Sequence, residues 1–244
     1  SRHVGAVLRF GCMVAAFCVI ICFGLAANSS AALLWSEDFE NDTVGADPDN
    51  PPWNALQEPA NTSIDITNGL PWPNSTQVGH VGDSSTNGSA VYFRATEIPG
   101  VDHPLVTVSF DVYLDYPTKA PGYVSLDLLD ADGDAPSRPV RSVALHDLTA
   151  FLVRHWHHFD LVANFTGSAT NYNGRVLSNE KYDLWMDGKL VKSDFTTYPS
   201  DYSDGIDGVS FLCWSAQETD FKFDNVEIRD ETYVYDDILS GQMT

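Results

Sequence analysis

The chain has 244 residues and a formal net charge of −21 at neutral pH, because 34 acidic residues stand against only 13 lysines and arginines. The sequence contains no basic stripe that could neutralise phosphates, which argues against nucleic acids and anionic membranes as partners. The acidity is compatible with bound divalent cations, salty surroundings or solubility alone.

Residues 1–32 have the pattern of a secretory signal peptide. Arg2 and Arg9 form a short basic region, residues 10–27 are apolar, and Ser30-Ala31-Ala32 fits the small-residue pattern of a cleavage site. We therefore expect cleavage near Ala32 and a secreted, extracellular protein, or a periplasmic one in a bacterium, with no membrane contact after cleavage. The alternative is a retained membrane anchor, since the apolar run is nearly long enough to span a bilayer.

Removal of the leader would leave Cys213 as the single cysteine, because Cys12, Cys18 and Cys22 lie within residues 1–32. The mature chain could then form no intrachain disulfide, although the compartment would permit one. Cys213 lies in an apolar strand pattern, so we expect it to be a buried small hydrophobic residue.

Residues 33–230 carry short alternating apolar runs bounded by Gly, Pro, Asn and Asp, with almost no helical periodicity. Residues 41–89 are expected to be loop-rich because of their prolines, and the tail at 231–244 to be frayed. Strands are expected at 90–94, 106–115, 123–129, 140–145, 158–164, 182–186, 189–195, 209–214 and 221–228, with one short helix at 146–153. This pattern predicts one all-β domain, an antiparallel β-sandwich of the jelly-roll type.

Two short stretches predict local geometry. Asp187-Gly188 separates two expected strands and is a strong signal for a two-residue hairpin. Phe221 and Phe223 alternate in one phase, and Val226 and Ile228 alternate in the opposite phase. One extra residue near Asp224-Asn225 would restore a single buried face, so we predict a β-bulge there.

Four motifs carry a resemblance to a known class of domains. They are Leu34-Trp-Ser-Glu-Asp-Phe-Glu40, Trp156-His-His-Phe-Asp-Leu161, Tyr182-Asp-Leu-Trp-Met-Asp-Gly-Lys-Leu-Val191 and Lys222-Phe-Asp-Asn-Val-Glu-Ile228. This arrangement resembles the concanavalin A-like, laminin G-like jelly rolls of secreted proteins over most of residues 33–230. The two end motifs also look like those of jelly-roll carbohydrate-binding modules.

Such modules often hold a structural calcium ion between their first and last strands. The resemblance therefore implies a Ca²⁺ site formed by Glu37, Asp38 or Glu40 together with Asp224, since Ca²⁺ takes six to eight oxygen ligands. The alternative is that these acids are solvated charges that protect a sheet edge from pairing with another chain.

Aromatic side chains are candidates for sugar stacking. Trp53 follows Pro51-Pro52 and Trp72 lies between two prolines, which exclude a central strand, so we expect both on loops. Tyr198 and Tyr202 are similar candidates, and packing beneath a loop is the alternative for all four. The tryptophans within strand patterns are expected in the core; they are Trp156, Trp185 and Trp214.

Signals for catalysis are weak. The Glu-x-Asp-x-x-Glu strand motif of laminarin and agar hydrolases with this fold is absent, and Glu37-Asp-Phe-Glu40 has the wrong spacing. On a strand, His155 and His157 would share one face, either as exposed side chains or as a Zn²⁺ pair. The sequence therefore does not favour an enzyme.

The sequence also contains an excess of Asn-x-Ser/Thr acceptor sites for N-glycosylation. Five of them would survive cleavage of the leader: Asn41, Asn61, Asn74, Asn87 and Asn164.

Together these features predict a secreted, non-catalytic carbohydrate-binding or extracellular-matrix module, braced by calcium. Its expected partners are a polysaccharide or glycan, and other extracellular proteins. One alternative is a polysaccharide lyase or glycoside hydrolase of the same fold. Another is a structural subunit of an extracellular surface assembly.

Overall fold

The structure, a computed structural model, describes residues 32–48, 53–57, 62–69, 75–83, 90–95, 98, 103–115, 123–130, 138–144, 154–196, 206, 208–214 and 219–230. Within these ranges the chain forms fifteen strands and no helix, so no helix there could span a membrane. The expected signal peptide, the short helix at 146–153 and the tail at 231–244 lie outside the described residues.

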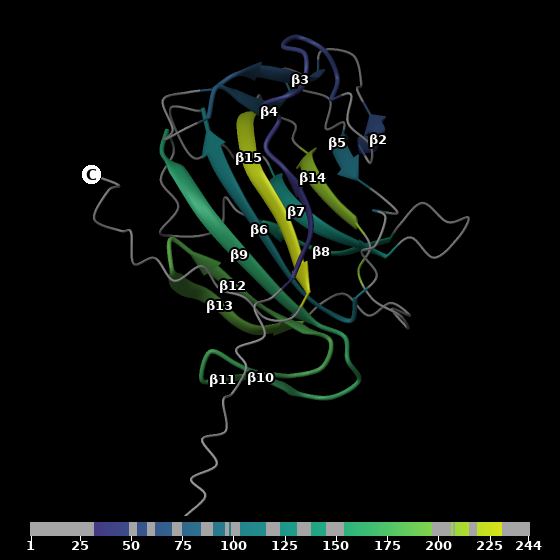
Figure 1. Cartoon of the computed structure of the whole chain (residues 1–244), viewed down its shortest axis with the longest axis vertical. Coiled ribbons are helices and arrows are strands. Elements are labelled where there is room, and N and C mark those ends of the chain that lie inside the picture. Colours follow the sequence, from purple (N-terminus) through teal and green to yellow (C-terminus); the bar gives the residue numbers. More distant parts are fainter. Residues whose placement is uncertain are drawn as a thin grey trace, which may run out of the picture. The chain divides into compact units, whose positions relative to one another are not determined.

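The larger sheet has eight antiparallel strands (Figure 1). From one edge to the other they are β13 (Lys189–Thr196), β12 (Lys181–Met186), β9 (Trp156–Asn164), β6 (Leu105–Leu114), β15 (Thr219–Asp230), β4 (Gln77–Asp83) and β3 (Thr62–Asn68). The eighth strand, β1 (Leu33–Glu37), pairs with the second half of β15, as the two end motifs suggested. The first half of β15 pairs with β4 instead.

The second sheet has five strands, again antiparallel. Their order is β2 (Trp53–Gln57), β5 (Ala90–Ala95), β14 (Gly208–Trp214), β7 (Tyr123–Asp130) and β8 (Arg138–Ala144). A separate hairpin is formed by β10 (Thr170–Tyr172) and β11 (Arg175–Leu177).

Aromatic rings from both sheets meet in one core. Phe211 of β14 stacks on Phe223 of β15 with ring centroids 4.1 Å apart, and it meets the edge of Phe110 on β6 at 5.6 Å. All three rings are fully buried, as expected for side chains that supply most of the hydrophobic stabilisation. The two sheets therefore pack face to face, and the predicted antiparallel β-sandwich is confirmed.

The two predictions of local geometry are also confirmed. Asp187 and Gly188 both have positive φ angles, 50° and 69°, and they close the β12–β13 hairpin as a type I′ turn would. The register between β15 and β6 shifts between Asp224 and Glu227, and Asn225 takes a φ of 49°. Cys213 is fully buried, as expected.

The expectation of a loop-rich region at residues 41–89 is wrong in part, because β2, β3 and β4 lie there. The prolines flank these strands and do not interrupt them. Ile64 and Ile66 alternate into the core from β3, at 2% and 0% exposure. The prolines predict loops, whereas the short alternation of these two isoleucines indicates the strand that the structure has.

Candidate functional site

Strand β6 places a row of polar and aromatic side chains on the outer face of the larger sheet, away from the core. Its register with β9 pairs Ser109 with Asp160, Asp111 with His158, and Tyr113 with Trp156. Because side chains of cross-strand pairs lie on the same face, these pairs form three parallel rows across the two strands.

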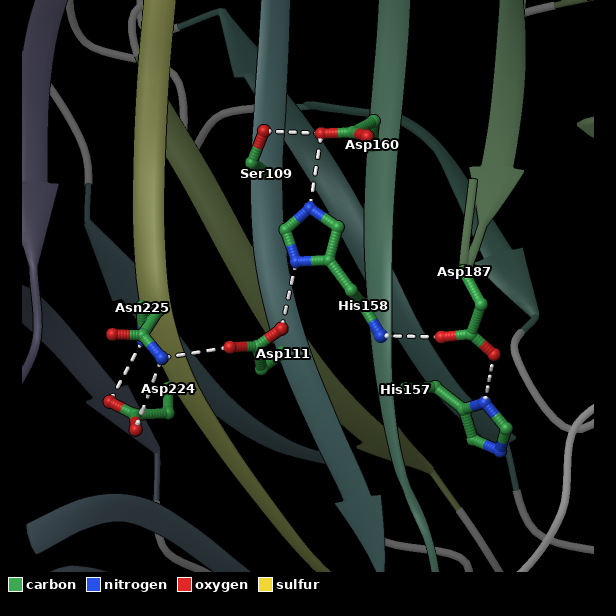
Figure 2. A network of polar contacts seen from close by, with 8 residues as sticks. All are labelled: Ser109, Asp111, His157, His158, Asp160, Asp187, Asp224 and Asn225. Atoms are coloured by element: carbon green, nitrogen blue, oxygen red, sulfur yellow. Dashed lines mark hydrogen bonds and ion pairs between the residues drawn. The ribbon is translucent and has the colours of Figure 1, made fainter. Parts of the chain in front are cut away.

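The central row is held by His158, whose ring lies between two carboxylates (Figure 2). Its Nδ1 is 2.8 Å from an oxygen of Asp111, and its Nε2 is 3.3 Å from an oxygen of Asp160. Burial would lower the pKa of His158, but the hydrogen bonds and negative charges of the two aspartates raise it to about 10. The imidazolium is therefore the stable form at neutral pH.

Neighbouring groups extend this row on both sides. Asn225, at the bulge of β15, donates from Nδ2 to the second oxygen of Asp111 at 2.8 Å. On the other side, the His158 amide donates to Asp187 at 3.0 Å. Figure 2 shows the resulting chain of contacts from β15 through β6 and β9 to the β12–β13 turn.

His157 points the opposite way from His158 and is 5% exposed, which contradicts the expectation of an exposed pair with His155. Its Nδ1 contacts Asp187 at 2.7 Å. Burial would raise the pKa of Asp187, but the hydrogen bonds from His157 and the His158 amide lower it below its ordinary value. Within the described ranges, no three or more His, Cys, Asp or Glu side chains are grouped to hold a metal ion.

The aromatic row lies next to the His158 row. Tyr113 and Trp156 are both half-buried, with ring centroids 5.6 Å apart. Trp156 was expected in the core, and this is wrong. Phe159 and Leu161 face the core from β9, so alternation places Trp156 outside.

The β10–β11 hairpin covers another part of the outer face. Tyr172 and Leu177 of this hairpin pack with Val162 and against Trp185. The Trp185 Nε1 donates to the Tyr172 hydroxyl at 3.2 Å, and this hydroxyl donates to the fully buried Asp183. Arg175 adds an ion pair to Asp183 at 3.1 Å, so the buried charge is compensated.

Two of the four expected calcium ligands, Glu40 and Asp224, contact the same hydroxyl group. The Ser75 hydroxyl lies 3.1 Å from Glu40 Oε1 and 2.5 Å from Asp224 Oδ2, and 3.1 Å from the Gln77 carbonyl. Glu37 and Asp38 instead accept bonds from backbone amides two residues ahead, at 2.9 and 3.2 Å.

The surroundings of Asp224 are unfavourable for its charge. Burial raises its pKa to about 7, and the nearby carboxylates of Asp111 and Glu40 add to the shift, although bonds from Ser75 and the Asn225 amide oppose it. The Ser75 hydroxyl has one proton for three acceptor oxygens. Glu40 also accepts bonds from the Thr76 and Gln77 amides, at 2.6 and 3.1 Å, and from the Thr76 hydroxyl, and these bonds lower its pKa.

Of the four aromatic residues proposed for stacking, the structure describes Trp53 alone. Trp53 begins β2, is 7% exposed and packs against Phe39, Trp35 and Phe223 at 5.6–6.2 Å. Its place in the core contradicts the expected display on a loop. Trp72, Tyr198 and Tyr202 lie outside the described residues.

The structure describes two of the five expected glycosylation sites, Asn41 and Asn164. Asn164 is fully buried, and its Nδ2 is directed at the carbonyls of Ser168, Leu177 and Ser178 at 2.8–3.2 Å. A glycan on this nitrogen is incompatible with the fold, so the prediction is wrong for Asn164. Asn41 is exposed, while Asn61, Asn74 and Asn87 lie outside the described ranges.

No protein-family model and no curated protein matches the sequence. Among solved structures, the chain is similar to the cellulose-induced protein Cip1, with a TM-score of 0.52 and 13% identity over 82% of this chain and 98% of that one. It is also similar to the conserved carbohydrate esterase vb_24B_21 from the Shiga toxin-encoding bacteriophage phi24B. The TM-score there is 0.52, with 8% identity over 83% of this chain and 100% of that one.

At these identities the likeness shows the fold alone. The class of protein that the two sheets and these similarities define is a jelly-roll β-sandwich, as the sequence motifs suggested.

Proposed function

We propose that this chain is a secreted, non-catalytic carbohydrate-binding module whose ligand lies on the outer face of the larger sheet. The observation that carries the proposal is the half-buried Tyr113–Trp156 pair, which lies beside the Asp111–His158 row. Sugar rings combine an apolar face with hydroxyls around the rim. An aromatic surface flanked by fixed polar groups suits both parts.

The polar row is suited to recognition because its members are already held in place. Asp111 is fixed by Asn225 and His158, and His158 is fixed by Asp111 and Asp160. Pre-organised groups lose little side-chain entropy when a ligand arrives, so more of the interaction energy contributes to affinity.

The same row supports a binding role over a catalytic one. A general base works best with a pKa near the working pH, whereas His158 has a pKa raised to about 10 and keeps its proton. Asp111 and Asp160 are both engaged by this imidazolium.

The similar solved structures also support a carbohydrate-related role. One of the similar structures is named as a carbohydrate esterase and another as a cellulose-induced protein. The esterase leaves an enzyme of the same fold as the alternative, which assays for released reducing ends, unsaturated products or acyl groups would detect.

Binding is tested by affinity electrophoresis and calorimetry on a polysaccharide panel with the wild type and Trp156→Ala. We expect at least a tenfold loss of affinity in the variant, because a stacked aromatic at the centre of a site carries a large share of binding energy. Phe195→Ala is the matched control, since Phe195 is an exposed aromatic on the edge strand β13, 48% exposed. Equal affinity of the wild type and Trp156→Ala would contradict the proposed site.

We further propose that Ca²⁺ binds at the start of the domain, with Glu40, Asp224 and Ser75 as ligands and the Gln77 carbonyl beside them. The approach of Glu40, Asp224 and the Gln77 carbonyl to one hydroxyl supports this, as does the raised pKa of Asp224. The cation would supply the positive charge that the two carboxylates lack.

Calcium binding is tested by thermal unfolding with chelator and with added calcium. At a concentration 100 times Kd, the ion would stabilise the fold by about 2.7 kcal/mol, which raises Tm by roughly 5–10 °C for a domain of this size. We expect no such rise in Asp224→Asn. An identical Tm for the wild type with calcium and with chelator would rule out the brace and leave the edge-protection alternative.

A further inference from the structure

Among the described residues, the strands around the Tyr113–Trp156 pair hold cationic side chains that are already engaged by carboxylates. On β4, β6, β9 and β15, each histidine, lysine and arginine side chain is within ion-pair distance of an aspartate or glutamate, as is Arg154 just before β9. They are His80, His157, His158, Lys222 and Arg229.

Lys222 lies over one ring of the aromatic pair. Its Nζ lies 5.7 Å from the centre of the Tyr113 ring. It is also 3.3 Å from Asp220 and 3.5 Å from Asp115, and the residue is only 9% exposed. Two carboxylates therefore already surround this ammonium, which would otherwise be free to meet a ligand on Tyr113.

His80 repeats the arrangement of His158 on the neighbouring strands. Its ring bridges Asp65 at 2.6 Å and Asp220 at 3.3 Å. Burial would lower its pKa, but these two aspartates raise it. Each of the two histidines is thus outnumbered by carboxylates, and the face has an excess of negative charge.

The remaining lysines of the larger sheet lie at its far edge, on β12 and β13. Lys189 and Lys192 pair with Met186 and Leu184, which face the core, so these two lysines lie on the other face of the sheet. Lys181 pairs with Asn164, six residues along β9 from His158. At about 3.3 Å per residue this separation is roughly 20 Å. These lysines therefore cannot neutralise an anion placed on the aromatic pair.

An anionic sugar on this face would lose hydration, find its possible partners already paired, and lie among several aspartates. Like-charge contacts of this kind discriminate strongly against a wrong partner. An uncharged sugar would stack and hydrogen-bond without this cost.

Resting on the function proposed above, we infer that the ligand is an uncharged polysaccharide, built of sugar units without carboxylate or sulfate groups, and that the paired cations of this face exclude its anionic counterparts.

The test compares polysaccharides that share a backbone and differ in charge. Suitable pairs are hydroxyethyl cellulose with carboxymethyl cellulose, and unsubstituted xylan with glucuronoxylan, measured in 20 mM and 500 mM NaCl. We expect a neutral member to bind at least tenfold tighter than its charged partner, and high salt to narrow this gap because it screens the repulsion.

Charged members that bind as tightly as neutral ones, or tighter, would overturn this inference and leave the proposed function intact. Absence of binding to every member of the panel would overturn both.

A gain-of-binding variant tests the mechanism directly. Asp115→Asn with Asp220→Asn would leave Lys222 without a carboxylate partner beside Tyr113. It would also release Arg154 from Asp115 and leave His80 with Asp65. We expect a two- to fivefold gain in affinity for carboxymethyl cellulose in 20 mM NaCl, lost in 500 mM NaCl, as for one partly exposed ion pair. Binding of the neutral polysaccharide should not change.

The control is Asp47→Asn with Glu180→Gln, which removes the same two charges at exposed positions elsewhere. An equal gain in this control would show that net charge, and not the pairing of Lys222, excludes anions. Either that result or an unchanged affinity in the first variant would overturn the inferred mechanism.

Discussion

Strand β6 is buried on both of its faces, and the two faces are built from opposite kinds of side chain. Toward the core it presents fully buried apolar residues such as Val108 and Phe110. Toward the outside it presents Ser109 and Asp111, which are also only 4% exposed. Burial alone therefore does not distinguish the face that holds the fold together from the face that we propose for ligand binding.

The difference lies in how each face compensates for the loss of water. The core face gains from burial directly, by about 25 cal/mol per Å² of apolar surface. The outer face needs a partner for each polar group, since an unsatisfied buried group costs about 1–3 kcal/mol. Asp111 and Asp160 have such partners in His158, Asn225 and Ser109.

Of the substitutions on the two faces, we expect the largest loss of stability from one on the core side. Phe223→Ala removes a ring that stacks on Phe211 at 4.1 Å, so we expect a loss of about 3–5 kcal/mol in the free energy of unfolding. Urea denaturation would measure it. A loss below 1 kcal/mol would mean that the two sheets are not held together by these rings.

A smaller but pH-dependent loss is expected on the outer side. His158→Gln leaves Asp111 and Asp160 buried without their cation, and we expect this broken buried pair to cost about 3 kcal/mol at neutral pH. The pKa of His158 is raised to about 10 in the fold, above the ordinary value of about 6.5.

The sign of the pH dependence follows from this shift. The stabilisation by His158 is complete below about pH 6.5 and is lost as the pH rises toward 10. Wild-type stability should therefore fall over this window, and His158→Gln should lack that part of the slope. Parallel profiles for the two proteins would contradict the ion-pair arrangement.

The smallest effect on stability is expected at the proposed binding surface itself. Trp156 is half-buried on the outer face, so Trp156→Ala should cost about 1 kcal/mol or less in the free energy of unfolding while it removes ligand affinity. Trp185→Ala provides the contrast, because Trp185 packs against the β10–β11 hairpin. We expect about 2 kcal/mol there, and the reverse order would assign Trp156 a structural role.

Much of the fold could be predicted because it depends on short alternating patterns. Alternation located nine of the strands, and the Asp187-Gly188 dipeptide and the phase change around Asp224 predicted the turn and the bulge. The strands at residues 53–83 have a weaker signal, because the flanking prolines indicate loops and the alternation of Ile64 and Ile66 is short.

The site could be predicted less well because it depends on register between distant strands. Asp111 and His158 are 47 residues apart, and only the pairing of β6 with β9 brings them together. The phase of alternation in β9 did contain the signal for Trp156, since Phe159 and Leu161 fix the core face. Sequon spacing contained no information about the burial of Asn164.

The most direct test of the account is a titration of the isotopically labelled protein with neutral hexasaccharides (cellohexaose, xylohexaose and mannohexaose) followed by amide and indole NMR shifts. We expect one of them to perturb Tyr113, the Trp156 indole and His158 most strongly, with Ser210 and Ser125 of the five-stranded sheet unchanged. Shifts centred on the five-stranded sheet, or no shifts on the outer face of the larger sheet with any of the three, would contradict the account.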